Sequence, residues 1–200
     1  MRQRKIGLLG GSFNPAHEGH RDLSLAALSA LGLDEVWWLV APQNPLKPVA
    51  GMAPLAQRLA QARATADHPR IRITDIERRL GTRYTADTLA KLVGRYRSCR
   101  FVWLMGADNL HQFDRWKDWT QIFHLLPIAV FDRPSYTYGA LAAKAARRFA
   151  RYRKRESAGH LLALASTPAW MFVHHRLNPI SATAIRAAAS KAQALASKIG

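Results

Sequence analysis

The sequence predicts an α/β fold in which a doubly wound, mostly parallel sheet is covered by helices on both faces. Three observations support this: short apolar runs alternate with amphipathic segments, glycine or proline closes the runs, and several runs contain no polar position. A run of that kind is typical of a strand buried on both sides. Repeated strand and helix units build a parallel sheet whose ligand crevice lies beyond the carboxyl ends of its strands.

The elements follow from these patterns in chain order. The predicted strands are residues 6–9, 36–40, 71–73, 101–105, 128–131 and 170–173. Gly10 and Gly11 are expected to form a turn after the first strand, and residues 41–48, rich in proline and asparagine, a loop after the second. Helices are predicted at 19–31, along the stripe Leu55, Leu59, Ala62 and Ala66, and at 85–96 with Thr85 as N-cap.

Length and composition limit the function classes. A chain of 200 residues, 48% of them hydrophobic, is expected to form one compact domain over residues 1–200. The net charge of +17 favours anionic partners, whether nucleotides, polyphosphates, nucleic acid or acidic lipid. Cys99 is the only cysteine, which fits a reducing cytoplasm and leaves no thiolate metal site. No apolar stretch approaches the ~18 residues of a membrane span.

The segment after the first strand has the composition of a phosphate-binding helix start. It reads Gly10-Gly11-Ser12-Phe13-Asn14-Pro15-Ala16-His17-Glu18-Gly19-His20. The glycines permit close approach of the backbone to a phosphate. The spacing of His17 and His20 puts both imidazoles at the N-terminus of one helix. Unpaired N–H groups, the helix dipole and imidazole donors together suit negative charge on a transferring phosphoryl group. A single histidine is more often structural, so the prediction depends on the whole string.

A second anion-binding helix start is predicted near the C-terminus. The segment reads Ile180-Ser181-Ala182-Thr183-Ala184-Ile185-Arg186. Ser181 or Thr183 can cap the helix, and Arg186 falls in its first turns. Such a cap followed by arginine is common, so its value lies in the pairing with the first motif.

These two motifs together resemble the nucleotidylyltransferase superfamily, which carries His-x-Gly-His after the first strand and a Ser/Thr-x-x-Ile-Arg helix start near the C-terminus. More narrowly, the chain is similar to nicotinate-nucleotide adenylyltransferases. Four intervening pieces also match: Pro42-Gln43-Asn44-Pro45-Leu46-Lys47, Tyr84-Thr85-Ala86-Asp87-Thr88, Gly106-Ala107-Asp108-Asn109 with Phe113 and Trp116, and Arg133-Pro134. The glycine loop departs mildly, with Ser12 and Asn14 where the family often has Thr and Asp.

The resemblance implies a single Rossmann-like nucleotidylyltransferase domain that joins the AMP part of ATP to nicotinate mononucleotide and releases pyrophosphate, in NAD biosynthesis. It implies that His17, His20 and Arg186 are catalytic. It implies that the ATP phosphates and nucleotide are held by Gly10, Gly11, Ser12, Phe13, Lys47, Gly106, Asp108, Arg133, Ser181 and Thr183. Mg²⁺ is expected to accompany ATP with mostly water ligands, without an all-protein metal site.

The pyridine end is expected near Thr85, Ala86 and Trp116. A flat indole can stack on the ring, and amides at a helix start can receive a carboxylate, which favours nicotinate over nicotinamide. A simpler role stays open for three single residues: Trp116 as an ordinary aromatic, Asp108 as a helix cap, and Arg133 as the partner of an acid.

One further segment is distinguished by its charge. Lys144, Arg147, Arg148, Arg151, Arg153, Lys154 and Arg155 lie in an alanine-rich stretch that is expected to be an exposed helix. A solvated basic face is its ordinary interpretation, and a nucleic-acid-binding protein on the same fold is the hypothesis from another class. An adenylyltransferase for nicotinamide mononucleotide or phosphopantetheine, and a nucleotide sensor that binds ATP without reacting, also stay open. The sequence leaves a homo-oligomer open.

Overall fold

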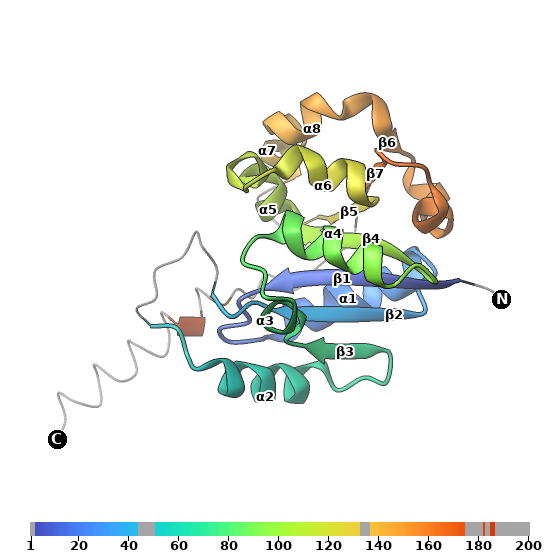
Figure 1. Cartoon of the computed structure of the whole chain (residues 1–200). Helices are drawn as coiled ribbons and strands as arrows, with labels where there is room; N and C mark the ends of the chain where they lie inside the picture. Colours follow the sequence, from blue (N-terminus) through green and yellow to red (C-terminus); the bar gives the residue numbers. More distant parts are fainter. Residues whose placement is uncertain (1–2, 44–50, 133–136, 175–181, 183–184, 187–200) are drawn as a thin grey trace, which may run out of the picture.

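The computed structural model describes residues 3–43, 51–132 and 137–174, together with positions 182, 185 and 186. In these residues seven strands form one sheet in the order β3-β2-β1-β4-β5-β7-β6, and every pair is parallel. Helices pack on both sides of this sheet (Figure 1). The predicted doubly wound α/β fold is therefore confirmed.

The strands are β1 (Arg4–Gly11), β2 (Glu35–Val40), β3 (Ile71–Thr74), β4 (Cys99–Gly106), β5 (Ile128–Phe131), β6 (Arg153–Lys154) and β7 (Trp170–Val173). The α-helices are α1 (Glu18–Ala30), α2 (Leu55–Ala66), α3 (Ile76–Leu80), α4 (Thr85–Arg95), α5 (Ala107–His111), α6 (Trp119–Leu125), α7 (Thr137–Ala142) and α8 (Lys144–Arg148). Short 3-10 helices are η1 (Phe113–Arg115), η2 (Ala150–Tyr152) and η3 (Glu156–Leu164).

The sheet separates two apolar clusters, because successive side chains of a strand point to opposite faces. In β2, Trp37 and Leu39 pack with α3, α4, α5, α6, α7 and α8 on one face. Val36, Trp38 and Val40 pack with α1, α2 and η3 on the other. Strands covered on both faces have no room for polar positions, and this explains why their apolar runs were recognisable in the sequence.

The strand order reverses between β1 and β4. From β1 the chain adds β2 and then β3 on one side, whereas β4 pairs with the other side of β1. In open parallel sheets a crevice forms beyond the carboxyl ends of the strands at such a switch point. The segments after Gly11 and after Gly106 leave the sheet at this edge, so the fold brings two of the predicted motifs to the edge at which sheets of this kind bind ligands.

The expected glycine turn is wrong, because Gly10 and Gly11 are the last residues of β1 and pair with Leu39 and Val40. Packing gives Gly10 a different reason to be glycine: a Cβ there would lie 2.4 Å from the Trp103 ring. The chain leaves the strand only at Ser12 and Phe13, and Phe13 adopts a positive φ of 47°.

The predicted Thr85 cap is also wrong. Tyr84 is the N-cap of α4, with extended backbone and no capping side chain, and Thr85 is the first helical residue. The helix ends at Arg95 and has Tyr96 as its C-cap. The short helices α3, α5 and α6 were not predicted, because elements of five to seven residues are too short to display a helical period.

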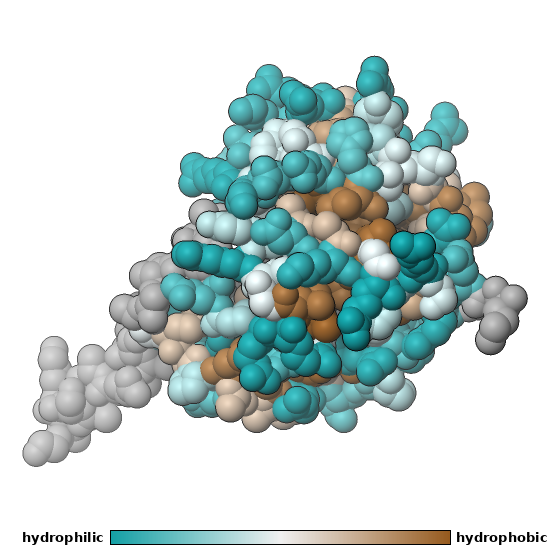
Figure 2. Space-filling model, in the orientation of Figure 1, coloured by the Kyte–Doolittle hydropathy of each residue, from teal (hydrophilic) through white to brown (hydrophobic). Residues whose placement is uncertain are grey.

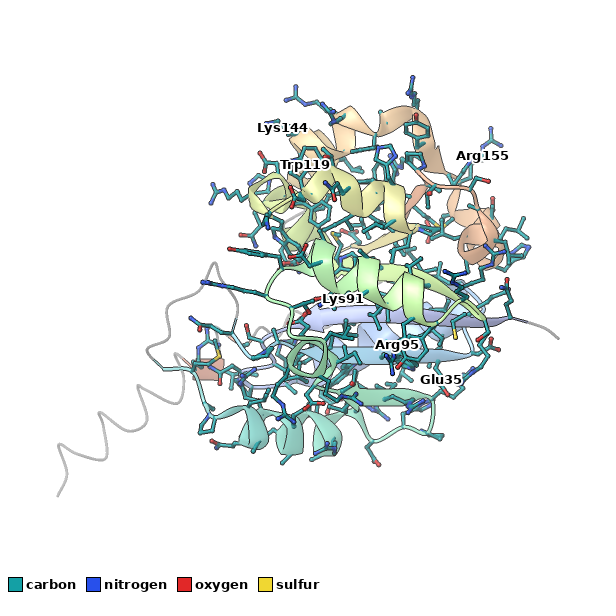
Figure 3. The ribbon with its side chains drawn as sticks, viewed as in Figure 1. Glu35, Lys91, Arg95, Trp119, Lys144 and Arg155 are labelled. Atoms are coloured by element: carbon teal, nitrogen blue, oxygen red, sulfur yellow. The ribbon has the colours of Figure 1, made fainter. Side chains whose placement is uncertain are left out.

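The basic segment is not one exposed helix. It divides into α8, η2 and the edge strand β6, and Ala145, Ala146 and Phe149 are buried beneath it. Its cationic side chains remain exposed, and Lys144 and Arg155 project from opposite ends of the upper layer in Figure 3. In the view of Figure 2 the surface is largely hydrophilic. Among the described helices, none combines the length and apolar character needed to cross a membrane.

Candidate active site

The loop between β1 and α1 is held by buried side chains. Ser12 is 6% exposed and Phe13 is 2% exposed. The Phe13 ring stacks on Trp38 of β2, with centroids 5.0 Å apart and an interplanar angle of 13°. Because Trp38 is itself fully buried, the position of this loop is fixed by the core.

His17 and His20 meet at the start of α1, as their spacing predicted. His17 is the N-cap, and its backbone N–H donates to Nδ1 of His20 at 3.3 Å. The two ring centroids are 3.9 Å apart. Since Nδ1 of His20 accepts this bond, the proton of the neutral ring lies on Nε2. Nε2 of a neutral His20 ring is then a hydrogen-bond donor.

Two consecutive buried hydrogen bonds, called the relay below, connect the His20 backbone to β2. Trp38 Nε1 donates to Ser24 Oγ at 2.8 Å, and Ser24 Oγ donates to the His20 carbonyl at 2.8 Å. The side chain of Ser24 has no exposure. The relay joins the histidine turn of α1 to β2, and the sequence did not reveal it because a serine inside an apolar stripe carries no signal of its partner.

Arg186 connects the C-terminal motif to the first. Its Nη1 donates to the carbonyl of Asn14, which lies 172 positions earlier in the chain. The arginine of the second predicted motif therefore reaches the loop that carries the first. Ser181 and Thr183, which were predicted beside Arg186, lie outside the described residues, as do Lys47 and Arg133.

Asn14 ties the same loop to the segment before α2. Its Nδ2 donates to the Gly51 carbonyl at 2.9 Å, and its Oδ1 accepts the Ala53 N–H at 3.1 Å. The side chain that departs from the usual aspartate thus acts as donor and acceptor at once, which an ionised carboxylate cannot do.

Arg58 of α2 is a second site-supporting residue that was not predicted from the sequence. It is 1% exposed, and it donates to carbonyl groups of Ser12, Ala41, Pro42 and Ala53. A signal was present, because Arg58 lies on the buried stripe with Ala62 and Ala66. An arginine on an apolar stripe has to find buried acceptors.

The end of β4 adds the third predicted segment. Gly106 is buried and is the N-cap of α5, and Asp108 lies half-buried in the first turn of that short helix. The interpretation of Asp108 as the helix cap is therefore wrong. Asp108 follows the carboxyl end of β4, which pairs directly with β1, so its backbone belongs to the same edge of the sheet as the loop that follows β1.

The predicted pyridine residues lie on the α4 face of the sheet. Ala86 is 3% exposed, whereas Thr85 and Trp116 are half-buried. Trp116 packs against Phe113 and Trp103, with ring centroids 5.0 and 6.3 Å away. The start of α4 and the Trp116 segment lie side by side, since Lys117 Nζ is 4.5 Å from the centroid of the Tyr84 ring.

A cavity of about 460 Å³ opens beside this helix start. Its lining includes the cations Arg83, Lys91 and Lys117 and the carboxylate of Asp87. Figure 3 shows Lys91 and Arg95 along α4. Thr85, Ala86 and Trp116 are not among the lining residues, so the cavity borders the predicted pyridine position rather than coinciding with it.

Glu77 is a buried acid in α3, the short helix that precedes α4. It is 7% exposed, and burial raises the pKa of its carboxyl from 4.5 to about 7. Its backbone carbonyl accepts the Thr82 N–H at 3.0 Å, while Gly81 takes the left-handed conformation that ends α3. Nothing in the local sequence distinguishes Glu77 from an ordinary exposed acid of a first helical turn.

The loop after β1 is rich in hydrogen-bond donors. In the part of the chain that the structure describes, no group of three or more His, Cys, Asp and Glu side chains is placed to hold a metal ion. The loop instead gathers two imidazoles, a guanidinium and backbone amides at a helix start. This combination fits a bound polyphosphate.

Comparison with known proteins agrees with this site. The cytidylyltransferase-like family model matches residues 8–188, so the chain belongs to this family of nucleotidyltransferases. Within it, a probable nicotinate-nucleotide adenylyltransferase of Methylorubrum extorquens is 53% identical over 91% of this chain and 98% of that protein. Another from Ruegeria pomeroyi is 54% identical over 92% of this chain and 85% of that protein. Both relatives, each more than half identical to this chain, are thus probable nicotinate-nucleotide adenylyltransferases.

Solved structures support the fold. A Plasmodium falciparum nicotinic acid mononucleotide adenylyltransferase complexed with NaAD has a TM-score of 0.68, with 14% identity over 92% of this chain and 82% of that one. A putative nicotinate-nucleotide adenylyltransferase from Vibrio parahaemolyticus has a TM-score of 0.53, with 21% identity over 64% of this chain and 76% of that one.

Proposed function

We propose that the chain transfers the adenylyl group of ATP to nicotinate mononucleotide, forming nicotinate adenine dinucleotide and pyrophosphate in NAD biosynthesis. The relatives at about half identity support this reaction. The observation in the structure that supports it most is the bond from Arg186 to the Asn14 carbonyl, which brings the arginine of the second predicted motif to the loop of the first.

The chemistry explains the character of the site. A phosphate oxygen of the mononucleotide forms a bond to the α-phosphorus of ATP, while the bond from that phosphorus to the oxygen bridging to the β-phosphate breaks and pyrophosphate leaves. The attacking oxygen is already ionised at neutral pH, so no protein nucleophile is needed. The enzyme has to align two polyanions and stabilise the charge that accumulates.

The donors of the site have distinct roles in this proposal. His17 and His20 contact the ATP phosphates, with the backbone amides of Ser12 and Phe13 beside them, and Gly10 and Gly11 bring the strand to this point. Arg186, with Ser181 and Thr183, holds the departing pyrophosphate. Lys47 and Arg133 are further phosphate and nucleotide contacts, and Gly106 and Asp108 border the nucleotide.

Magnesium belongs to this proposal as the ion that accompanies ATP. Mg²⁺ gives up its water ligands reluctantly, so in this proposal the ion would be held mainly by phosphate oxygens and water. When bound, it neutralises charge on the phosphates. The chain's own residues then orient the triphosphate around it.

In this proposal nicotinate mononucleotide binds near the start of α4. The indole of Trp116 stacks on the pyridine ring, and the amides of Thr85 and Ala86 at the start of α4 receive the carboxylate. A neutral carboxamide gains less from a helix start, so nicotinate mononucleotide is preferred over nicotinamide mononucleotide. Residues 1–200 act as one nucleotidylyltransferase domain, located in the cytoplasm where ATP is available.

The experiment is pyrophosphate release from Mg·ATP with nicotinate mononucleotide, nicotinamide mononucleotide or phosphopantetheine supplied separately. We expect strong preference for nicotinate mononucleotide. Preference for another acceptor would keep the chemistry and overturn the assigned pocket. No pyrophosphate release with any of the three acceptors, together with salt-sensitive binding of nucleic acid, would favour a nucleic-acid-binding protein.

A further inference from the structure

Arg58 is a buried cation whose acceptors are all backbone carbonyls. Nε donates to Ala53 at 2.9 Å, Nη1 to Ser12 at 2.6 Å and to Ala41 at 2.7 Å, and Nη2 to Pro42 at 2.8 Å. In the part of the chain that is described, no carboxylate forms an ion pair with it. Burial lowers the pKa of its guanidinium, yet arginine stays charged in proteins.

The four carbonyls come from three segments that meet at the switch point. Ser12 lies in the loop after β1, Ala41 and Pro42 directly follow β2, and Ala53 precedes α2. Only a planar fork with several donors can hold acceptors from three directions at once. An ammonium on a flexible stem cannot reproduce this geometry.

The contact with Ser12 sets the direction of the next amide. The peptide between Ser12 and Phe13 is trans, because cis bonds in the described chain occur at Asn14-Pro15 and Thr167-Pro168. In a trans peptide the C=O and N–H point in opposite directions. With the Ser12 carbonyl directed to Arg58 inside the protein, the Phe13 N–H is directed away from Arg58.

An anion site built from backbone needs this arrangement. Carbonyl oxygens carry partial negative charge, and any that faced the phosphates would repel them. Arg58 binds carbonyl oxygens of the loop after β1 and of the residues after β2, and it does so inside the protein. A hydrogen bond from a cation to a carbonyl also polarises the peptide, so that the N–H of the same peptide becomes a better donor.

We propose that Arg58 is a positioning residue for the ATP phosphates: it fixes the Ser12–Phe13 peptide and both ends of the segment between β2 and α2, so that amides rather than carbonyls face the triphosphate. This inference rests on the proposed assignment of the Phe13 amide to the ATP phosphates. Arg58 does not touch substrate, and its effect passes through the backbone that it holds.

The test compares two pairs of variants in the full chain. Arg58→Lys keeps the charge and removes the fork, and Arg58→Met keeps the length and removes the charge. The matched controls are Arg63→Lys and Arg63→Met, because Arg63 lies on the exposed face of the same helix. For each protein we would measure kcat, KM for ATP and for nicotinate mononucleotide, the Kd of a non-hydrolysable ATP analogue, and Tm.

We expect Arg58→Lys to stay folded and to lose roughly 10- to 100-fold in kcat/KM for ATP, as misplaced binding groups do. The Kd of the ATP analogue should rise with it, while KM for nicotinate mononucleotide stays near the wild-type value. Arg58→Met should lose more, and both Arg63 variants should match the wild type.

Three results would overturn the inference. One is a kcat/KM for ATP and a Kd of the ATP analogue that are the same in Arg58→Lys and in the wild type. Another is an equal loss of kcat/KM for ATP and for nicotinate mononucleotide, which would indicate that the whole protein has become less rigid. The third is loss of the folded state in Arg58→Lys, which would make Arg58 a residue of core stability alone. Failure of the proposed function itself is recognised separately, since the wild-type protein would then release no pyrophosphate.

Discussion

The two regions proposed to bind the substrates, called the phosphate end and the pyridine end below, are built by different physical means. At the phosphate end, Ser24, Arg58 and His17 are buried polar groups, the first two hydrogen-bonded to backbone carbonyls and His17 through its own backbone N–H. At the pyridine end, Trp116 is half-buried among aromatic rings beside an open cavity. Directed bonds fix orientation, whereas ring packing and an open cavity supply contact area. We therefore expect changes at the phosphate end to lower turnover, and changes at the pyridine end to weaken acceptor binding.

The largest effect is expected from His17→Ala. The proposal assigns His17 as a donor to the developing phosphate charge, so its removal should reduce kcat by roughly 10²- to 10³-fold. The fold should survive, since loss of an N-cap costs about 1 kcal/mol. Steady-state kinetics and thermal unfolding measure both, with His160→Ala at an exposed position as the control. Unchanged turnover would remove His17 from the catalytic residues.

Glu77→Gln tests whether the buried carboxyl of Glu77, in the helix before α4, makes the stability of the protein depend on pH. The folded pKa of Glu77 is raised to about 7 from 4.5, so between these pH values the folded state binds more protons than the unfolded state. Stability of the wild type therefore falls as pH rises through this window, by up to about 3 kcal/mol in total. Glu77→Gln should become more stable than the wild type as pH rises from 4.5 to 7.

Urea unfolding at several pH values measures this difference. Asp67→Asn, at an exposed position, should keep the wild-type pH dependence. A Glu77→Gln stability curve parallel to that of the wild type across the window would contradict a buried, protonated carboxyl.

Trp116→Ala should have a smaller and more selective effect. Loss of ring stacking on pyridine should raise KM for nicotinate mononucleotide by about tenfold and leave KM for ATP near its wild-type value. Trp119→Ala removes a neighbouring indole that packs on Phe113, Phe123 and Phe149, and it should lower Tm without this selectivity. A rise in KM for ATP instead would move the pyridine pocket elsewhere.

The smallest effect is expected from neutralising Arg147, Arg148 and Arg151 together by glutamine. These side chains are exposed over buried alanines, and exposed charges contribute little to stability. Activity should stay at the wild-type level. A large loss of turnover would show that the basic segment takes part in the reaction after all.

The sequence predicted the sheet well because burial on both faces leaves no polar position in the apolar runs of β2, β4, β5 and β7. It predicted that His17 and His20 would meet, since they are three positions apart at the start of a helix. It also indicated that Arg186 belongs with them, although only through resemblance, because no local pattern reveals a contact over 172 positions.

The supporting residues were harder to predict. Arg58, Ser24 and Asn14 act through bonds to carbonyls in other segments, and those partners become visible only when β1, β2 and α2 are assembled. Thr85 was wrongly expected to cap α4, because a threonine at a helix boundary fits the cap and the first turn equally well. Glu77 was missed since α3 has only five residues, too few to show which face is buried.

The central claim is that the crevice directs attack at the α-phosphorus of ATP. The most direct measurement follows labelled phosphorus from ATP into the products, with Mg²⁺ and nicotinate mononucleotide present. The account predicts that label from the α-position appears in the dinucleotide and label from the γ-position appears in pyrophosphate. Transfer of the γ-label to the mononucleotide, or α-label that never enters a dinucleotide, would contradict it.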